Sequence, residues 1–148
     1  MPETNAHTNP HRRTRRDHAM ETAEDYVEAV ADLLGQQERC RVIDLARRFG
    51  VSHVTVTRIV ARLQNEGLLA TAPYQPISLT AKGKRLAGRS RRRHDVVFSF
   101  LRAIGVDEQT AAVDAEGIEH HVSPKTLRCF EEMIQQLGND QNSSDRAV

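Results

Sequence analysis

Two short amphipathic segments joined by a single glycine constrain the fold of this chain more than any other feature of its sequence. In residues 41–49 apolar side chains recur at helical spacing, and Gly50 then supplies a turn. Ser52 is a good N-cap for a further helix with its own apolar stripe. Two short strands, 68–72 and 76–79, follow. Helix, turn, helix and β-hairpin in this order predict a winged helix-turn-helix.

Helical periodicity also covers most of the rest of the chain. The further helices that we expect run from about Thr22 to Leu34, Thr80 to Ile104, Asp107 to His121 and Ser123 to Leu137, with Thr22 and Thr80 as N-caps. The predicted fold class is mainly α with a small β-hairpin wing. The predicted divisions are a disordered arm at 1–21, an N-terminal winged helix-turn-helix domain at 22–80, a C-terminal helical domain at 81–137 and a flexible tail at 138–148.

The composition bounds the class of protein. The chain has 148 residues, 39% of them hydrophobic, and no apolar run long enough to span a membrane. Residues 1–18 are polar, so we expect no signal peptide. Cys40 and Cys129 are too few for a disulfide framework and favour reduced thiols. We therefore expect a soluble, cytoplasmic protein of one or two small domains.

The net charge of +1 conceals a segregation of charge along the chain. Residues 39–93 contain 13 Lys and Arg against 2 acidic residues, whereas residues 1–38 contain 4 against 8 and residues 94–148 contain 4 against 10. A basic middle flanked by acidic ends favours a polyanion-binding module joined to a part that uses carboxylates. A solvated charged surface is the alternative.

The second helix of the predicted helix-turn-helix has a polar side that suits DNA recognition. Hydroxyls near a helix N-terminus bond phosphates or base edges, and arginine reads guanine in the major groove, so we single out Arg58 for base readout. The DNA-binding candidates on this helix are Ser52, His53, Thr55, Thr57, Arg58 and Arg62. Contacts to the DNA backbone are expected from Arg62, Lys82, Lys84 and Arg85. For any one of these side chains alone, a merely solvated helix face is the alternative.

A pattern typical of metal ligands occurs near the end of the helix predicted at 107–121. Glu116, Glu119 and His120 stand at i, i+3 and i+4, so their side chains share one helix face. Two carboxylates and an imidazole suit a borderline divalent metal. They are too few to complete a site, so partners must come from elsewhere in the chain.

Two other places offer such partners. Asp25 and Glu28 stand at i and i+3 on the first helix, and His94 lies along the helix predicted at 80–104. The combined set has four carboxylates, whose charge of −4 two divalent cations would balance. Each of these three residues also suits a role without metal, Asp25 at a helix N-terminus, Glu28 on a solvated face and His94 as a structural histidine.

The motifs Glu24-Asp25-Tyr26-Val27-Glu28, Arg93-His94 and Asp114-Ala115-Glu116-Gly117-Ile118-Glu119-His120-His121-Val122-Ser123 together carry a resemblance. The chain resembles the diphtheria toxin repressor family of metal-dependent winged-helix repressors over about residues 22–137. The similarity includes the Leu79-Thr80-Ala81-Lys82-Gly83 start of the long helix. The combined motifs are much more specific than the helix-turn-helix alone.

The resemblance implies a homodimer that binds a palindromic operator when manganese is plentiful and represses manganese uptake genes. It implies DNA binding for residues 22–80 and metal binding and dimerisation for residues 81–137. Iron-responsive relatives place methionine and cysteine where this chain has Asp25 and Glu116, and hard oxygens at both positions favour Mn(II). The implied ligands of two Mn(II) ions per subunit are Asp25, Glu28, His94, Glu116, Glu119 and His120.

One departure from the family concerns the wing tip, where relatives commonly carry Arg-Gly and this chain has Gln75-Pro76. We expect weak DNA contact from this wing, or a different turn. An iron-responsive repressor of the same family and a winged-helix regulator of a small organic ligand are the alternative functions. A di-metal oxidase is disfavoured because the chain has no Glu-x-x-His motif, and we expect no enzymatic activity and no membrane partner.

Overall fold

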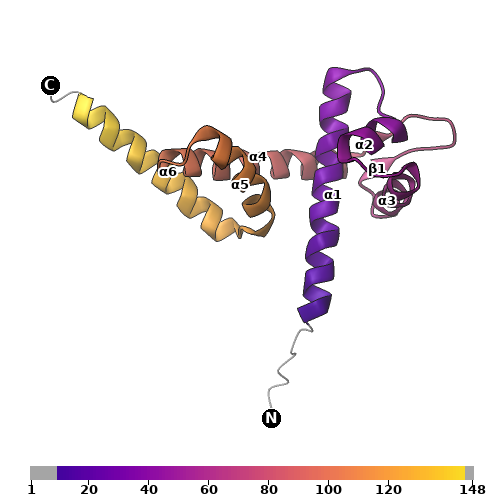
Figure 1. Ribbon diagram of the computed structural model, residues 1–148, viewed down its shortest axis with the longest axis horizontal. Coiled ribbons are helices and arrows are strands. Elements are labelled where there is room, and N and C mark those ends of the chain that lie inside the picture. The colour runs from indigo at the N-terminus through magenta and orange to yellow at the C-terminus, as the bar shows by residue number, and fades with distance from the viewer. Residues whose placement is uncertain (1–9, 146–148) are drawn as a thin grey trace, which may run out of the picture. The chain divides into compact units, whose positions relative to one another are not determined.

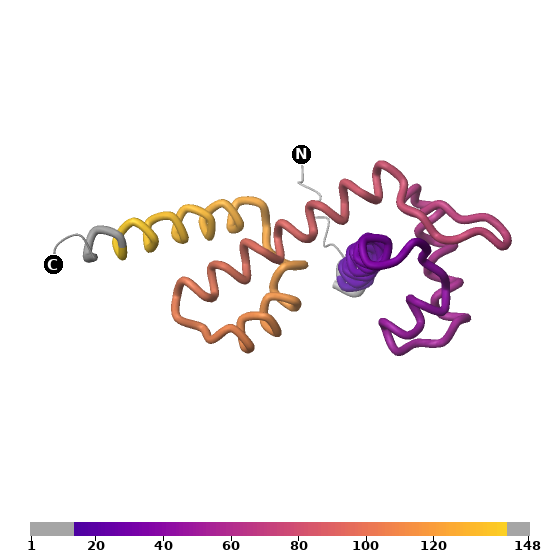
Figure 2. Tube along the Cα trace, turned by 90° about the horizontal axis from the view of Figure 1, so that it is seen from above, coloured from indigo at the N-terminus to yellow at the C-terminus, as the bar shows by residue number. Residues whose placement is uncertain are grey.

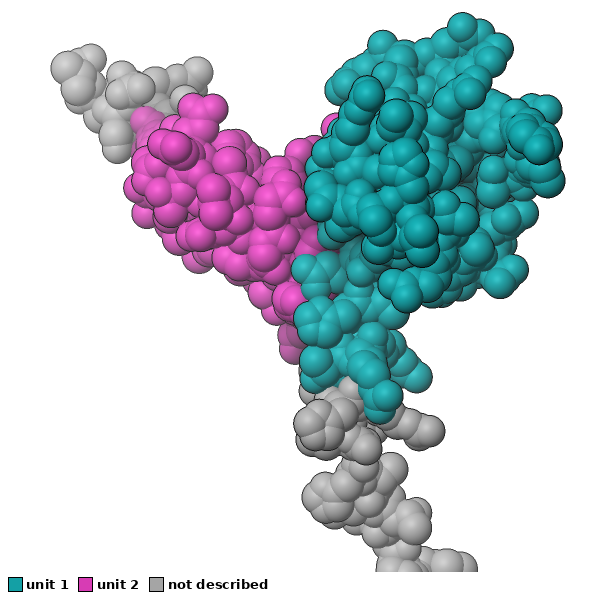
Figure 3. Space-filling view, turned by 45° about the vertical axis from the view of Figure 1, so that its right-hand side comes forward, with its two compact units in different colours: residues 1–87 teal, residues 88–148 magenta. Residues whose placement is uncertain are grey.

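The computed structural model describes residues 10–145, which form helices joined by short connections and one small sheet (Figure 1). The elements are α1 (Pro10–Gln36), α2 (Val42–Phe49), α3 (His53–Asn65), β1 (Leu69–Ala70), β2 (Ser78–Leu79), α4 (Ala81–Ala103), α5 (Glu108–Ile118), the 3₁₀ turn η1 (Glu119–His121) and α6 (Pro124–Asp145). They belong to two compact units, Met1–Ala87 and Gly88–Val148 (Figure 3). The predicted fold class, mainly α with a small hairpin, is confirmed.

Unit 1 has the predicted winged helix-turn-helix, built on a core that α1, α2, α3 and the hairpin share. Val27 of α1, Leu45 of α2 and Val56 of α3 are completely buried. Burial of a side chain of this size contributes about 2 kcal/mol to folding. The rings of Tyr26 and Phe49 stack with centroids 4.4 Å apart, which adds an aromatic contact between α1 and α2.

The turn and the cap predicted between α2 and α3 are both present. Gly50 has a φ of 63°, a left-handed conformation that costs glycine little, and it ends α2. The Oγ of Ser52 accepts a hydrogen bond from the backbone N–H of Thr55 at 3.1 Å, as an N-cap does.

The hairpin is short and antiparallel, with Leu69 opposite Leu79. An isolated bridge between Cys40 and Ile77 ties it to the segment before α2. Both strands are shorter than predicted, because residues 71–76 form a loop instead of continuing the ladder. This loop projects from the body of unit 1 (Figure 2).

The start of α4 fits closely against the hairpin. The hydroxyl of Thr80 accepts from the N–H of Gly83 at 3.0 Å and donates to the carbonyl of Gly67 at 2.6 Å, which confirms Thr80 as the cap. A Cβ on Gly83 would lie 2.0 Å from the carbonyl oxygen of Leu68. Glycine at this position therefore allows the first turn of α4 to approach the backbone before β1.

Unit 2 has a smaller core. Its buried residues are Val97, Ala115 and Val122, with Phe98, Leu101, Leu127 and Phe130 packed against them. The rings of Phe100 and Phe130 stack with centroids 4.0 Å apart. Asp107 caps α5 by accepting from the N–H of Thr110 at 2.9 Å, and hydrogen bonds from Thr110 lower the pKa of Asp107.

The first helix begins earlier than predicted. It starts at Pro10 instead of Thr22, so the part of the expected arm that is described, residues 10–21, is helical. Proline is favourable in the first turn of a helix, and no helix breaker follows before Gly35. Thr22 is not a cap, since its hydroxyl donates to the carbonyl of His18 at 2.9 Å within the helix. The rest of the expected arm, residues 1–9, lies outside the described residues.

The other differences concern boundaries. The two compact units divide inside α4, after Ala87, while the domain boundary that we place at 80–81 stays a prediction. The helix predicted to reach His121 ends at Ile118 and continues as η1. The last helix extends to Asp145, so it includes most of the expected tail, while residues 146–148 lie outside the described part. Within residues 10–145 no helix combines the length and apolar character needed to cross a membrane.

We expect Gly83→Ala to lower the free energy of unfolding by about 2 kcal/mol, because the added methyl group meets backbone that cannot easily move. Gly88→Ala, on the same helix with open space around it, is the matched control and should stabilise by about 0.5 kcal/mol through helix propensity. Urea unfolding of both variants measures the difference. Equal effects would contradict the close approach.

Candidate metal centre and nucleic-acid interface

Three elements of unit 2 bring four of the predicted metal ligands together. His94 lies on α4, Glu116 near the end of α5, and Glu119 and His120 in η1. Ala115 of α5 is completely buried in a core that also contains Val97 of α4. Because η1 continues α5 as a tighter turn, its two ligand candidates stay next to Glu116.

The distances within this cluster are short. His94 Nδ1 lies 2.6 Å from Glu119 Oε2 and 3.6 Å from Glu116 Oε1. His120 Nε2 lies 3.5 Å from Glu119 Oε1. One ligand atom from each of His94, Glu116 and Glu119 lies within 4.8 Å of the others. A single cation could therefore be reached by all three side chains.

Glu119 is the buried centre of the cluster. Its side chain is 3% exposed, as is that of His120, whereas the side chain of Glu116 is 68% exposed. Burial raises the pKa of Glu119 to about 7, against the favourable charge and hydrogen bond of His94, and repulsion from Glu116 adds to the rise. A carboxyl group in this setting favours either a proton or a cation beside it.

The donor atoms fit a hard or borderline divalent cation, since they are carboxylate oxygens and imidazole nitrogens. Neither cysteine belongs to the cluster: Cys40 is buried in the core of unit 1, and Cys129 is exposed on α6. The cluster therefore lacks the soft sulfur ligand that would favour a different class of metal.

The two remaining predicted ligands, Asp25 and Glu28, lie on α1 in unit 1. Both are half-buried, and their spacing puts them on one face of the helix. Their participation in one site with the four residues of unit 2 stays a prediction.

Arg93 supports the cluster, a role that the sequence did not reveal. Its Nη2 donates to the carbonyl of Val122 at 2.9 Å, and the neighbouring Arg92 pairs with Glu131 at 2.8 Å. These contacts hold the segment after η1 and helix α6 against α4, next to His94. Spacing could not have indicated the Arg93 contact, because it joins a side chain to a backbone carbonyl 29 residues away.

Most of the predicted DNA-binding side chains lie at the surface of α3. His53, Thr57 and Arg58 are exposed. The hydroxyls of Ser52 and Thr55 lie 2.9 Å apart, and that of Thr57 donates to the carbonyl of His53 at 2.8 Å. The hydroxyls are thus held at the helix N-terminus, where the helix dipole favours a phosphate group.

Arg62 has a different environment from the one we predicted. Its Nη2 donates to the carbonyl of Ala19 on α1 at 3.1 Å, and its Nε lies 3.5 Å from Glu66 Oε1. The sequence placed Arg62 on the polar side with Arg58, one turn earlier. These contacts join α3 to α1, and the assignment of Arg62 to DNA stays a prediction.

Comparison with known proteins agrees with both parts of this description. Residues 18–77 match the family described as "Iron dependent repressor, N-terminal DNA binding domain". Residues 80–145 match the family described as "Iron dependent repressor, metal binding and dimerisation domain". The chain belongs to the iron-dependent repressor family, whose members are transcriptional regulators rather than enzymes.

Among curated relatives, the transcriptional regulator MntR of Escherichia coli O6:H1 is 42% identical over 132 residues, which cover 89% of this chain and 85% of the relative. The HTH-type transcriptional regulator MntR of Bacillus subtilis (strain 168) is 36% identical over 117 residues, covering 79% and 82%. The family's two domains are therefore both represented in this chain.

Among solved structures, the manganese regulator SloR has a TM-score of 0.67 at 25% identity and covers 76% of this chain. A manganese-dependent transcriptional repressor in complex with manganese has a TM-score of 0.63 at 29% identity and covers 78% of this chain. This chain spans about half the length of those two, 53% and 52% respectively.

The raised pKa of Glu119 predicts that affinity for a divalent cation such as Mn(II) increases from about pH 4.5 to about pH 7. The folded protein keeps this carboxyl protonated in that range, and the proton must leave before a cation binds. The same shift makes the metal-free protein less stable as pH rises, since its unfolded chain binds fewer protons there.

Calorimetry in buffers of different ionisation enthalpy measures both the affinity and the number of protons released. Glu108→Gln, which removes an acid from the first turn of α5, is the control and should titrate like the parent. An affinity independent of pH, without proton release, would contradict the assignment of Glu119.

Proposed function

We propose that this chain is a manganese-responsive transcriptional regulator that, as a metal-loaded homodimer, binds a palindromic operator and represses manganese uptake genes. The observation that carries the proposal is the cluster of His94, Glu116 and Glu119 in a chain that also has a winged helix-turn-helix. The curated relatives named MntR and the manganese regulators of known structure support manganese as the metal. The protein would act in the cytoplasm, where bacterial operators are found.

The proposed ligands of two Mn(II) ions per subunit are Asp25, Glu28, His94, Glu116, Glu119 and His120. Their carboxylates would carry a charge of −4, which two divalent ions neutralise. The bound metal supplies positive charge between acids that would otherwise repel one another. The absence of sulfur from the unit 2 cluster agrees with a preference for Mn(II).

The proposed ligands come from both compact units, and this suggests how metal binding affects the DNA-binding helix. Asp25 and Glu28 belong to unit 1, which contains α3, whereas the other ligands belong to unit 2. When all six residues share metal, unit 1 loses freedom relative to unit 2. In a dimer, this loss of freedom narrows the range of distances between the two recognition helices. Distances near the roughly 34 Å between adjacent half-sites are then favoured. The response is a population shift set by the difference in metal affinity between the two states.

For DNA, we assign base readout to Arg58, which is exposed on α3. Ser52, His53, Thr55 and Thr57 form the N-terminal part of the same surface. The phosphate contacts that we propose are Lys82, Lys84 and Arg85, which are exposed at the start of α4. In the protein without DNA, Nζ of Lys82 donates to the carbonyl of Glu66 at 2.9 Å.

For the dimer, we assign the exposed side of α5. Val113 is 69% exposed, although Ala111 and Ala115 of the same helix are completely buried. A shallow hollow beside Val113 is lined by Gly117, Ile118 and Val122, among others. An exposed apolar side chain next to a glycine suits close contact with a second copy.

We expect Glu116→Ala to weaken the gain in DNA affinity produced by Mn(II) about tenfold or more, because it removes one ligand and leaves the fold of α3 untouched. Glu108→Ala removes an acid from the same helix outside the cluster and should behave like the parent. Titration of a labelled duplex, enriched from a random pool by the parent protein, measures the effect at fixed salt with and without Mn(II). If Mn(II) raises the DNA affinity of Glu116→Ala as much as that of the parent, Glu116 is not a ligand of the regulatory metal.

We expect Val113→Asp to dissociate the dimer, because each buried unpaired charge costs at least about 2 kcal/mol. Val54→Asp is the matched control, since Val54 is 78% exposed on α3 and is not assigned to the contact. Sedimentation equilibrium gives the dissociation constants. If both variants stay as dimeric as the parent, the contact lies elsewhere.

Iron is the second candidate metal, since both family descriptions name an iron-dependent repressor. Comparing Mn(II), Fe(II) and Zn(II) in the same DNA titration under anaerobic conditions decides between them. A response to Fe(II) at lower concentrations than to Mn(II) would replace the manganese assignment with the iron one.

A further inference from the structure

The tip of the hairpin contains an unusual turn. The N–H of Gln75 donates to the carbonyl of Ala72 at 3.0 Å, so residues 72–75 form a β-turn with Pro73 in its second position. Tyr74, in the third position, has a φ of +62°. Proline followed by a positive φ is the arrangement of a type II turn, in which the third residue is normally glycine or asparagine.

Tyr74 is an unfavourable residue for that position. It is the one non-glycine residue with a positive φ between residues 10 and 145. A bulky side chain pays a steric cost in this conformation, and such outliers concentrate at functional sites. Packing of the side chain within the protein does not offset this steric cost, because Tyr74 is fully exposed at 104%. A contact with another molecule would explain why an aromatic residue occupies this place.

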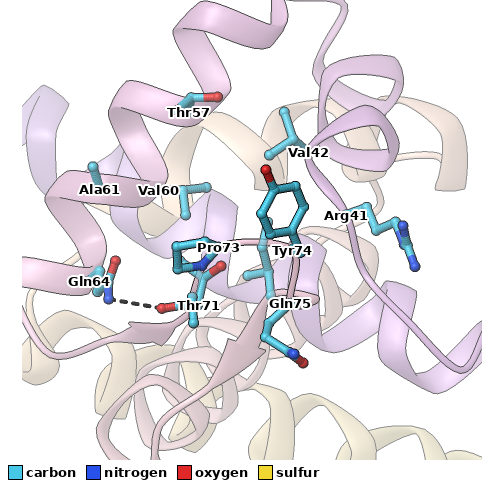
Figure 4. Close-up of a pocket in the computed structure, with 12 residues that line it drawn as sticks. Arg41, Val42, Thr57, Val60, Ala61, Gln64, Thr71, Pro73, Tyr74 and Gln75 are labelled. Atoms are coloured by element: carbon cyan, nitrogen blue, oxygen red, sulfur yellow. Dashed lines mark hydrogen bonds between the residues drawn. The ribbon is translucent and has the colours of Figure 1, made fainter.

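A hydrogen bond joins the segment just before the turn to the recognition helix α3. Gln64 of α3 donates from Nε2 to the carbonyl of Thr71 at 3.1 Å, just before the turn (Figure 4). A hollow lies between α3 and the hairpin loop, and its lining includes Thr57, Ala61 and Tyr74. Thr57 and Ala61 are exposed on α3, so the hollow continues the surface that we assign to DNA.

The hairpin carries no charge. Residues 68–80 contain no Lys, Arg, Asp or Glu. A DNA contact from this loop must therefore rely on apolar packing and neutral hydrogen bonds. Tyrosine provides both, since it has an apolar ring and a hydroxyl that can donate to a phosphate oxygen. Pro73 and Pro76 on either side restrict the loop and reduce the entropy lost on binding.

We propose that Tyr74 is a DNA contact, whose ring packs on a deoxyribose and whose hydroxyl donates to the adjoining phosphate, at the edge of the groove entered by α3. The proposal rests on the proposed function, because it requires that α3 bind duplex DNA. It replaces the expectation of a weakly bound wing with a specific, uncharged contact. A small molecule or a protein partner at the same hollow is the competing occupant, and the test separates these outcomes.

The test compares Tyr74→Ala, Tyr74→Phe and Tyr74→Gly with the parent, using Mn(II), the enriched duplex and a mixed-sequence duplex over a range of salt. Tyr74→Ala and Tyr74→Gly should bind both duplexes about tenfold more weakly, with an unchanged slope of log affinity against log salt. Tyr74→Phe should lose only part of this DNA affinity, and the size of its loss measures the contribution of the hydroxyl group. Arg85→Ala is the charged control and should flatten the slope by about 0.9.

Tyr74→Gly also guards against misfolding as the cause of weaker binding. Glycine adopts a positive φ without strain, so this variant should unfold at a higher temperature than the parent while binding DNA more weakly. A stability gain with unchanged DNA affinity would overturn the contact. If the parent itself binds no duplex with Mn(II), the proposed function fails instead.

Tyr74→Trp gives an independent readout, because the chain has no other tryptophan. Its emission should shift to the blue when the enriched duplex is added, as the ring leaves water. If the emission does not change when DNA is added, in a variant that still binds the duplex, the loop stays in solvent. That result would favour another occupant of the hollow beside Tyr74.

Discussion

The burial of the Glu119 carboxyl group is the constraint on which the function of unit 2 depends. It lies between two imidazoles, is almost completely excluded from water, and has a second carboxylate beside it in Glu116. Removal from water penalises its negative charge, and the raised pKa is the result. A site of this kind stores an electrostatic cost in the metal-free protein. Relief of that cost favours a cation at this site.

Helix α4 connects this site to the DNA-binding half. Its first turns are fixed to the hairpin by the Thr80 cap and by the close approach at Gly83, and its middle carries His94. The basic residues Lys82, Lys84 and Arg85 lie in these first turns. The sequence of α4 thus carries phosphate-contact candidates in its first turns and a metal-ligand candidate further along.

The sequence predicted the order of the elements and the caps Ser52 and Thr80, because glycine, proline and short hydroxyl side chains act locally, whereas the predicted cap Thr22 lies inside α1. It placed Glu116, Glu119 and His120 near one another for the same reason, since helical spacing determines which neighbours share a face. It failed where the outcome depended on distant contacts. The bond from Arg62 to Ala19, the bond from Arg93 to Val122 and the left-handed Tyr74 could not be read from any local pattern. The early start of α1 was missed because the composition of residues 10–21 suggested disorder, although nothing in them breaks a helix.

The bond between Arg62 and Ala19 has a consequence for how a signal could reach DNA. A second bond, from Arg48 of α2 to Asp32, joins α1 to the helix-turn-helix further along, at 2.7 Å. Asp25 and Glu28 lie between these two attachment points. Contacts to α3 and to α2 thus flank the two predicted ligands of α1, so a change in the position of this part of α1 would reach both helices of the helix-turn-helix.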